Sequence, residues 1–211
     1  MIILTSSVAS VAGHIYKNYL SDKEYKSILF VDTAVEPEIQ YDDAWLLADL
    51  KSLRDQGYTV DRYTITNKSR EDIESKINDY DILYMCGGNT EYLLSKLQMS
   101  DSLTLIVDKV KKGKPYIGIS AGSIIAGPRL PDYLLEDGPE LTDRTCLNLV
   151  NFTVVPHWGS EDFRDEYLGD RLKTVYKTTQ EPLLLLTDKQ YVIVDDDGML
   201  KIVDTNYGFM E

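Results

Sequence analysis

The sequence predicts an α/β fold in which helices cover both faces of a parallel sheet. Short apolar runs rich in β-branched and aromatic residues alternate with stretches of helical periodicity along most of the chain. Glycines follow several of the helical stretches, as is common where a chain leaves a helix. The length of 211 residues suits one domain, and no segment has the composition of an interdomain linker. We therefore expect residues 1–211 to form a single domain.

Five runs in the first 120 residues have the length and composition of buried strands. They are Ile2–Leu4, Ser27–Val31, Tyr58–Tyr63, Ile82–Met85 and Tyr116–Ile119. Because helical residues separate most of these runs, the strands should lie parallel in one sheet.

Three helical stretches between these strands have recognisable ends. The first begins at Asp42 or Asp43 and stops at Gly57. The second opens at Ser69 with the spacing of a capping box. The third runs over residues 102–113 and ends after two lysines, whose charge suits the negative end of a helix.

The last third of the chain has a different pattern. It predicts a strand, a long helix and then three more strands: Phe152–Val155, Phe163–Tyr176, Leu183–Leu186, Tyr191–Val194 and Met199–Val203. The last two strands flank Asp195-Asp-Asp-Gly198, which is the signature of a hairpin turn. We therefore expect a β-hairpin at the C-terminal end of the fold.

The composition excludes several classes of protein. The formal net charge of −13 argues against a nucleic-acid partner, because phosphate binding requires clustered lysine and arginine. No apolar run approaches the roughly 18 residues of a membrane span, and the first residues lack the pattern of a signal peptide. The two cysteines, Cys86 and Cys146, form neither a disulfide framework nor a metal-binding spacing. We expect a cytoplasmic protein with no membrane partner.

The segment Gly118-Ile-Ser-Ala-Gly122 has the pattern of a nucleophile elbow. It follows a predicted strand and precedes small and apolar residues that suit a helix. A serine on this sharp turn projects its hydroxyl outward, and the free N–H groups of the following helix stabilise nearby negative charge. Ser120 is therefore the candidate nucleophile. The alternative is a glycine-rich turn that packs against the sheet.

Only two histidines are available as a base for Ser120. His14 lies near the first strand, at what resembles the start of a surface helix. His157 follows the predicted strand Phe152–Val155, and functional sites of α/β sheets form at the carboxyl ends of strands. We therefore expect His157 to act as the general base.

The carboxylate that orients the imidazole has several candidates. Four candidates come from the acids between the serine and the histidine: Asp132, Glu136, Asp137 and Asp143. Asp188 instead follows the histidine, just after the predicted strand Leu183–Leu186. The segment Pro131–Glu140 is rich in acidic and turn-forming residues, so it is a poor platform for a rigid orienting group. This favours Asp188 without excluding the other four.

A second loop with chemical potential is Cys86-Gly-Gly-Asn-Thr90, directly after the predicted strand Ile82–Met85. Paired glycines let the backbone approach a ligand closely, and Thr90 can cap the helix that follows. An N–H group of this loop can join that of Ala121 to form an oxyanion hole. A phosphate-binding loop is the weaker interpretation, because neither common nucleotide-binding motif is present.

Three motifs occur in a fixed order: Tyr84-Met-Cys-Gly-Gly-Asn-Thr90, Gly118-Ile-Ser-Ala-Gly122 and Val155-Pro-His-Trp158. Together they resemble the dipeptidase E (aspartyl dipeptidase) family of serine peptidases, to which cyanophycinase is related. The resemblance spans most of the chain. It implies a flavodoxin-like three-layer sandwich with a mostly parallel sheet, like that of class I glutamine amidotransferases. Those enzymes have cysteine at the elbow, so the serine separates this chain from them.

The resemblance also implies a role for each matching residue. Ser120 would be the nucleophile, His157 the base and Asp188 the acid of a Ser-His-Asp triad. Gly88 and Ala121 would supply the oxyanion hole. The substrate pocket would be lined by Asn89, Thr90 and Arg164. The mechanism requires no metal and no cofactor.

The stretch after the histidine departs from the family pattern. Aspartate-preferring members bind the substrate carboxylate through an arginine within a longer stretch that contains glycine and threonine. Here Trp158–Arg164 is short and acidic, and Arg171 is a second candidate for this arginine. Arg164 can also pair with an acid one helical turn away. The sequence therefore does not decide whether Asp-X dipeptides are preferred.

These features predict a serine peptidase that hydrolyses short peptides through an acyl-enzyme. A short peptide is the expected substrate, because a compact domain offers a pocket more readily than a long cleft. We expect a monomer or a homodimer. The alternative function is a flavodoxin-like module that binds a small ligand without catalysis.

Overall fold

The structure is a computed structural model that describes residues 1–37, 44–134, 141, 143–167, 173–174 and 181–206. Within these residues, a seven-stranded sheet has the strand order β3-β2-β4-β5-β1-β8-β9. Its strands are β1 (Ile2–Thr5), β2 (Ser27–Val31), β3 (Thr59–Tyr63), β4 (Ile82–Met85), β5 (Tyr116–Ile119), β8 (Gln190–Val194) and β9 (Leu200–Asp204). The sequence therefore placed every one of these strands to within a residue at each end.

The sheet is mixed, with a parallel part and an antiparallel edge. Strands β1 to β5 are parallel to one another, as the alternation of strands and helices predicts. Strand β8 is antiparallel to β1, and β9 is antiparallel to β8. The predicted C-terminal hairpin is confirmed, and Gly198 has a φ of +79° in its turn.

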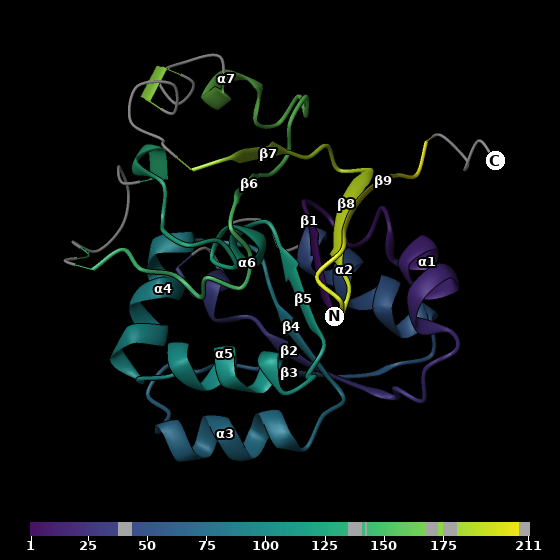
Figure 1. The fold of residues 1–211 in the computed structure, drawn as a ribbon, viewed down its shortest axis with the longest axis vertical. Coiled ribbons are helices and arrows are strands. Elements are labelled where there is room, and N and C mark those ends of the chain that lie inside the picture. Colours follow the sequence, from purple (N-terminus) through teal and green to yellow (C-terminus); the bar gives the residue numbers. More distant parts are fainter. Residues whose placement is uncertain (38–43, 135–140, 142, 168–172, 175–180, 207–211) are drawn as a thin grey trace.

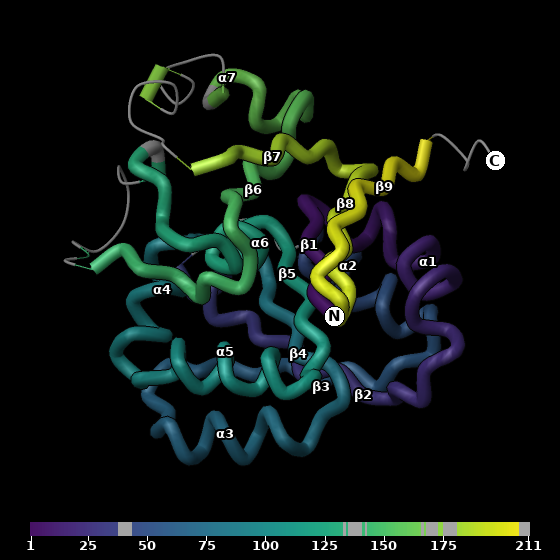
Figure 2. Tube along the Cα trace, in the orientation of Figure 1, coloured from purple at the N-terminus to yellow at the C-terminus, as the bar shows by residue number. Residues whose placement is uncertain are grey.

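Helices cover both faces of this sheet, as Figures 1 and 2 show. On one face lie α1 (Ala12–Ile15), its π-helical continuation η1 (Tyr16–Leu20), and α2 (Ala44–Asp55). On the other lie α3 (Arg70–Asn78), α4 (Thr90–Met99), α5 (Leu103–Lys111) and α6 (Ala121–Ile124). Short 3-10 turns, η2 (Thr33–Val35) and η3 (Asp132–Leu134), occur in the connections. Among the described residues, no helix combines the length and the apolar character that crossing a membrane requires.

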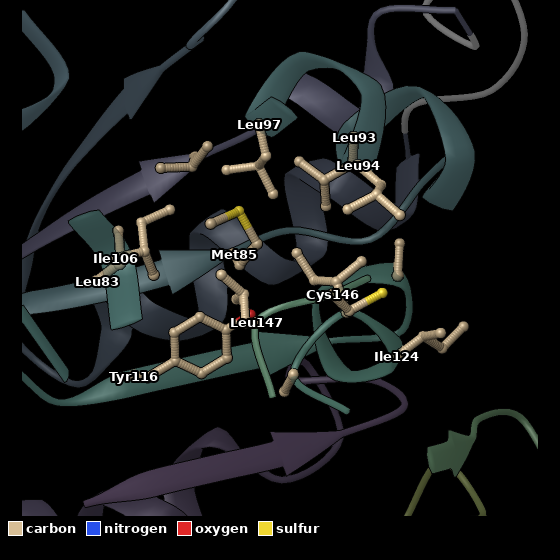
Figure 3. Packing of buried hydrophobic residues seen from close by; sticks show 14 of the residues in the cluster. Leu83, Met85, Leu93, Leu94, Leu97, Ile106, Tyr116, Ile124, Cys146 and Leu147 are labelled. Carbon is tan, nitrogen blue, oxygen red and sulfur yellow. The ribbon is translucent and has the colours of Figure 1, made fainter. Parts of the chain in front are cut away.

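The alternation of side chains along the strands divides the apolar core in two. Leu83 and Tyr116 point to one face, where they pack with Leu97 of α4 (Figure 3). Tyr84, the next residue after Leu83, points to the other face and packs in the cluster that contains Leu46 of α2. Both faces of the central strands are therefore buried, which explains their continuous apolar sequence.

A separate pair of parallel strands, β6 (Thr153–Val155) and β7 (Leu183–Leu185), lies outside the main sheet. Strand β6 packs against α6, the short helix that follows β5. This packing holds the ends of β6 and β7 close to the turn between β5 and α6. The arrangement matters for function, because the elbow serine lies in that turn.

Several predicted helix ends can be compared with the structure. The capping box at Ser69 is confirmed, because its side chain accepts a hydrogen bond from the N–H of Asp72. The predicted cap at Thr90 is wrong: Asn89 caps α4 by accepting from the N–H of Tyr92 at 2.8 Å, and Thr90 is the first helical residue. Asparagine suits the cap position better than threonine, so it is preferred here.

Two predicted helices fall partly on residues that the structure leaves undescribed. Of the predicted helix Phe163–Tyr176, the structure describes α7 (Arg164–Glu166) and residues 173–174. The expected start of α2 at residues 42–43 also lies outside the described residues.

Candidate active site

Ser120 lies at the sharp turn between β5 and α6. Its backbone angles, φ +46° and ψ −107°, are ones that residues other than glycine rarely adopt. Two glycines make the turn possible: a Cβ on Gly118 would lie 2.6 Å from the carbonyl oxygen of Gly122, and a Cβ on Gly122 would lie 2.1 Å from that of Met85. The elbow therefore presents the serine hydroxyl at the carboxyl end of the central strands.

Three side chains that are distant in sequence form a continuous line of hydrogen bonds. The Oγ of Ser120 is 3.0 Å from Nε2 of His157, and Nδ1 of His157 is 2.7 Å from Oδ1 of Asp188. An ionised carboxylate can only accept, so Nδ1 carries the imidazole proton and Nε2 accepts from the serine hydroxyl. The other histidine, His14, forms a hydrogen bond with the hydroxyl of Tyr191 instead.

The small parallel sheet brings His157 and Asp188 together. Val155 pairs with Leu185 at the ends of β6 and β7, and the N–H of Leu186 then donates to the carbonyl of Val155 at 3.0 Å. His157 and Asp188 follow these two strands in the chain. Adjacent parallel strands that end side by side therefore bring the imidazole and the carboxylate to the same place.

Further contacts fix the position of the imidazole. The backbone of His157 has a φ of +58°, and its N–H donates to Oγ of Ser6 at 3.1 Å. The hydroxyl of Ser6 donates in turn to the carbonyl of Leu186 at 2.9 Å. The imidazole stacks on Phe163 with the ring centroids 4.3 Å apart. Neither Ser6 nor Phe163 carries a sequence signal that marks this role.

Gly87 and Gly88 bring the loop after β4 against Ser120. A Cβ on Gly87 would lie 3.2 Å from Cβ of Ser120. Gly88 has a φ of +121°, and a Cβ there would lie 2.5 Å from the carbonyl oxygen of Ala34. The N–H groups of Gly88 and Ala121 donate to no other residue in the described part of the chain. Both amides are thus available to an oxygen bound beside Ser120.

These groups open onto a pocket with a volume of about 590 Å³. Its lining consists of Ser6, Ser7, Ala9, Trp45, Ala48, Asp49, Gly87, Gly88, Ile119, Ser120, His157, Ser160, Asp162, Phe163 and Asp188. The size falls within the range of pockets that bind small molecules. The hydroxyl, the imidazole and the two glycines therefore share one small cavity.

A family model described as peptidase family S51 matches residues 2–202. The chain belongs to peptidase family S51. Among curated relatives, an uncharacterized peptidase of Pasteurella multocida, PM1590, is 32% identical, with 98% of each chain covered. The uncharacterized peptidase Lmo0363 of Listeria monocytogenes is 28% identical over 90% of this chain and 96% of its own. Peptidase E of Shewanella denitrificans is 41% identical over 43% of this chain and 38% of its own.

Solved structures agree with this membership. A crystal structure from Listeria monocytogenes EGD-e, provisionally assigned to peptidase E, superposes with a TM-score of 0.82 at 25% identity over 96% of this chain and 97% of that one. A peptidase from an acI-B1 Actinobacterium has a TM-score of 0.69 at 16% identity, over 96% and 86% of the two chains, and supports the fold alone. The predicted resemblance to dipeptidase E and the predicted fold class are thereby confirmed.

The three residues that the resemblance placed at the substrate do not line the pocket of this S51 peptidase. The side chain of Asn89 is occupied as the cap of α4, and Thr90 is buried in the first turn of that helix. The side chain of Arg164 is 61% exposed and pairs with Glu161 at 3.3 Å, as expected for an acid one turn away. The other candidate, Arg171, lies outside the described residues.

Two of the four alternative acids have other partners. Asp132 pairs with Arg144, and Asp143 accepts from the N–H of Thr145 at 2.9 Å. The remaining two, Glu136 and Asp137, lie outside the described residues. Of the acids considered from the sequence, Asp188 is the one that contacts the imidazole in the described structure.

Sequence reasoning missed Asp49, a buried carboxylate that lines the same pocket in the S51 peptidase. Burial raises the pKa of Asp49 to about 6, while a hydrogen bond from the N–H of Ala9 opposes the rise. In α2 this residue lies on the buried face that Leu46, Leu50 and Leu53 form. A carboxylate in the middle of an apolar helix face is the sequence signal that would have indicated it.

Proposed function

We propose that this chain is a serine peptidase that cleaves short peptides through an acyl-enzyme on Ser120. The observation that carries the proposal is the line of hydrogen bonds from Ser120 through His157 to Asp188, with lengths of 3.0 and 2.7 Å. A hydroxyl, an imidazole and a carboxylate in this order activate serine in unrelated hydrolases. The name peptidase E, which several relatives carry, agrees with this chemistry.

In the first half of the reaction, Nε2 of His157 takes the proton of the Ser120 hydroxyl while Oγ attacks the carbonyl carbon of the peptide. Asp188 holds the imidazole in the correct tautomer and stabilises the imidazolium that forms. The imidazolium then gives its proton to the leaving amine. The products are a free amine and an ester between the acyl group and Ser120.

In the second half, water attacks the ester and gives its proton to His157. The acid is released when the proton returns to Oγ of Ser120. The carbonyl oxygen becomes negatively charged in both halves. We propose that the N–H groups of Gly88 and Ala121 donate to this oxygen, since preorganised donors of this kind lower the barrier in both steps.

A pocket of about 590 Å³ favours a small substrate over a long polypeptide. The aromatic rings of Trp45 and Phe163 supply apolar walls for a side chain. Short peptides such as dipeptides match this volume and chemistry, and they supply the carbonyl that Ser120 attacks.

A fluorophosphonate probe tests the nucleophile directly, because it reacts with activated serines whatever their substrate. We expect the probe to label the wild-type protein at Ser120, as located by mass spectrometry of the digested protein. Ser120→Ala should abolish this label, and His157→Ala should slow labelling at least a hundredfold. Circular dichroism of each variant controls for folding.

A library of dipeptides, assayed by the release of free amino acids, then tests the reaction. We expect turnover by the wild-type protein and none by Ser120→Ala. If Ser120 in folded wild-type protein fails to react with the probe and no dipeptide is cleaved, the proposal is wrong. A module that binds a small ligand without catalysis would then be favoured.

A further inference from the structure

Asp49 lies in the wall of the pocket, and the acyl-transfer steps make no use of it. Helix α2 directs Trp45, Ala48 and Asp49 to the pocket, because residues three and four apart lie on the same helix face. Asp49 is 4% exposed, and its carboxylate interacts electrostatically with His157. A buried carboxylate therefore lines the same pocket as Ser120 and His157.

The partners of this carboxylate are neutral. Its Oδ1 accepts from the N–H of Ala9 at 3.1 Å, and its Oδ2 accepts from the hydroxyl of Tyr84 at 3.3 Å. No lysine or arginine of the described residues pairs with it or contributes to its pKa. An ionised carboxylate has about four acceptor positions, so further donors can bind. Burial of a charge without an opposite charge costs stability.

The two hydrogen bonds do not explain why the residue is charged. An asparagine at this position would accept from the N–H of Ala9 through its amide oxygen. Its amide nitrogen would donate to the hydroxyl oxygen of Tyr84, which can accept as well as donate. Both contacts could thus be kept without burying a charge, with the loss only of an acceptor for the proton of Tyr84. The charge is therefore expected to serve a ligand.

The rest of the pocket has the same sign of charge. Asp162 and Asp188 also line it, and no lysine or arginine does so within the described residues. A cationic group on the substrate would therefore be attracted, and an anionic one repelled. An ammonium group offers one positive charge and three donors, which match the carboxylate of Asp49.

A short peptide carries such a group at the required place. In any unblocked peptide, the terminal ammonium is bonded to the carbon next to the first carbonyl. When that carbonyl lies at Ser120, the ammonium must lie in the same small pocket. Burial leaves the pKa of Asp49 at about 6, so the carboxylate is still mostly ionised at neutral pH.

We infer that Asp49 binds the α-ammonium group of the substrate, and that the enzyme therefore requires a free amino terminus. The inference rests on the proposed peptidase function and names the residue that sets its substrate class. A substrate with a blocked amino terminus leaves Asp49 buried and uncompensated, so such a substrate is discriminated against.

The test compares L-alanine p-nitroanilide with its N-acetyl derivative, and the Asp49→Asn variant with wild type. We expect wild type to prefer the free amine, and Asp49→Asn to raise the KM for the free amine about 10- to 100-fold. The ratio of kcat/KM for the free amine to kcat/KM for the N-acetyl derivative should therefore fall about 10- to 100-fold in Asp49→Asn. Asp55→Asn is the matched control, because it removes the same charge from the same helix. Asp55 pairs with Lys51 at the surface, so this variant should leave kcat and KM for both substrates unchanged.

Protection of Ser120 from the fluorophosphonate probe gives a readout that needs no turnover. We expect L-alaninamide to slow labelling of wild type but not of Asp49→Asn, and N-acetyl-L-alaninamide to protect neither. For each protein, the rate with an amide is divided by the rate of the same protein without one, so that any change in basal reactivity cancels. If Ser120 does not label, the proposed function fails. If it labels but L-alaninamide protects wild type no better than the acetylated amide does, only the inference about Asp49 fails.

Discussion

The imidazole of His157 lies parallel to the phenyl ring of Phe163, with 4.3 Å between the ring centroids and 7° between the ring planes. The two imidazole nitrogens are held by Ser120 and Asp188 at the same time. The stack therefore fixes the remaining freedom of the ring, its rotation about the line between those two hydrogen bonds. We therefore expect Phe163 to position His157, the proposed base.

Replacing Phe163 with leucine should lower kcat/KM about 2- to 10-fold. The estimate follows from the roughly 0.5–1.5 kcal/mol that a stacked aromatic pair contributes beyond its buried area. Because Phe163 also lines the pocket, the measurement is the rate at which a small fluorophosphonate labels Ser120, which depends on the base more than on substrate binding. Phe163→Tyr keeps the stacking face and serves as the control. An unchanged labelling rate in Phe163→Leu would show that the stack does not position the imidazole.

Asp188→Asn should lower kcat by roughly 10³- to 10⁴-fold with little change in KM. An amide side chain can donate to Nδ1 of His157, which would favour the tautomer that cannot accept the Ser120 proton. Steady-state kinetics on a cleaved dipeptide measure the effect. Asp132→Asn is the control, since Asp132 pairs with Arg144, and it should retain activity within about twofold. If Asp188→Asn kept its activity and Asp132→Asn lost it, Asp188 would not be the acid that orients His157.

The strands could be located from the sequence because both faces of the central sheet are buried. A strand such as Ile82–Met85 is then a short, continuous run of apolar residues, so its first and last residues can be identified from the sequence. The order of the strands could not be obtained in this way. The position of β8 between β1 and β9 depends on pairing between Ile2 and Val194, which lie at opposite ends of the chain.

The sequence could predict those site residues that lie within or next to a short recognisable motif. Ser120 lies within a five-residue motif, and His157 follows a strand, so both were found. Asp188 was favoured over the other acids by the turn-rich composition of Pro131–Glu140, and the family resemblance then singled it out. Ser6 and Phe163 were missed, because their roles are defined by contacts with His157 that only the folded chain creates.

Gly122→Ala should destabilise the fold by several kcal/mol. The new Cβ would lie 2.1 Å from the carbonyl oxygen of Met85, and a backbone atom in the buried strand β4 has little room to move. Urea unfolding followed by circular dichroism measures the change. Gly13→Ala in α1 is the matched control, because its Cβ would meet only the end of the Gln56 side chain at 4.0 Å; this variant should gain up to about 1 kcal/mol. Equal stability of the two variants would contradict the tight packing at the elbow.

Asp49 should make the stability of the protein depend on pH between about 4 and 7. Its pKa is about 6 in the native state against an ordinary value of 3.8, so the native state binds the proton more tightly than the unfolded chain does. The stabilising contribution is therefore complete below pH 3.8 and is lost as the pH rises through 6. A difference of roughly two pKa units corresponds to about 3 kcal/mol.

Asp49→Asn removes this titration. Its free energy of unfolding, relative to that of wild type, should increase by up to about 3 kcal/mol between pH 4 and pH 7.5, as measured by urea unfolding. If the ionised carboxylate is kept for an ammonium ligand, L-alaninamide at pH 7.5 should raise the stability of wild type and leave that of Asp49→Asn unchanged. If the free energy of unfolding depended on pH in the same way for both proteins, Asp49 would have the same pKa in the native and unfolded states. Burial of the ionised carboxylate would then cost no stability, and a ligand would have no such cost to relieve.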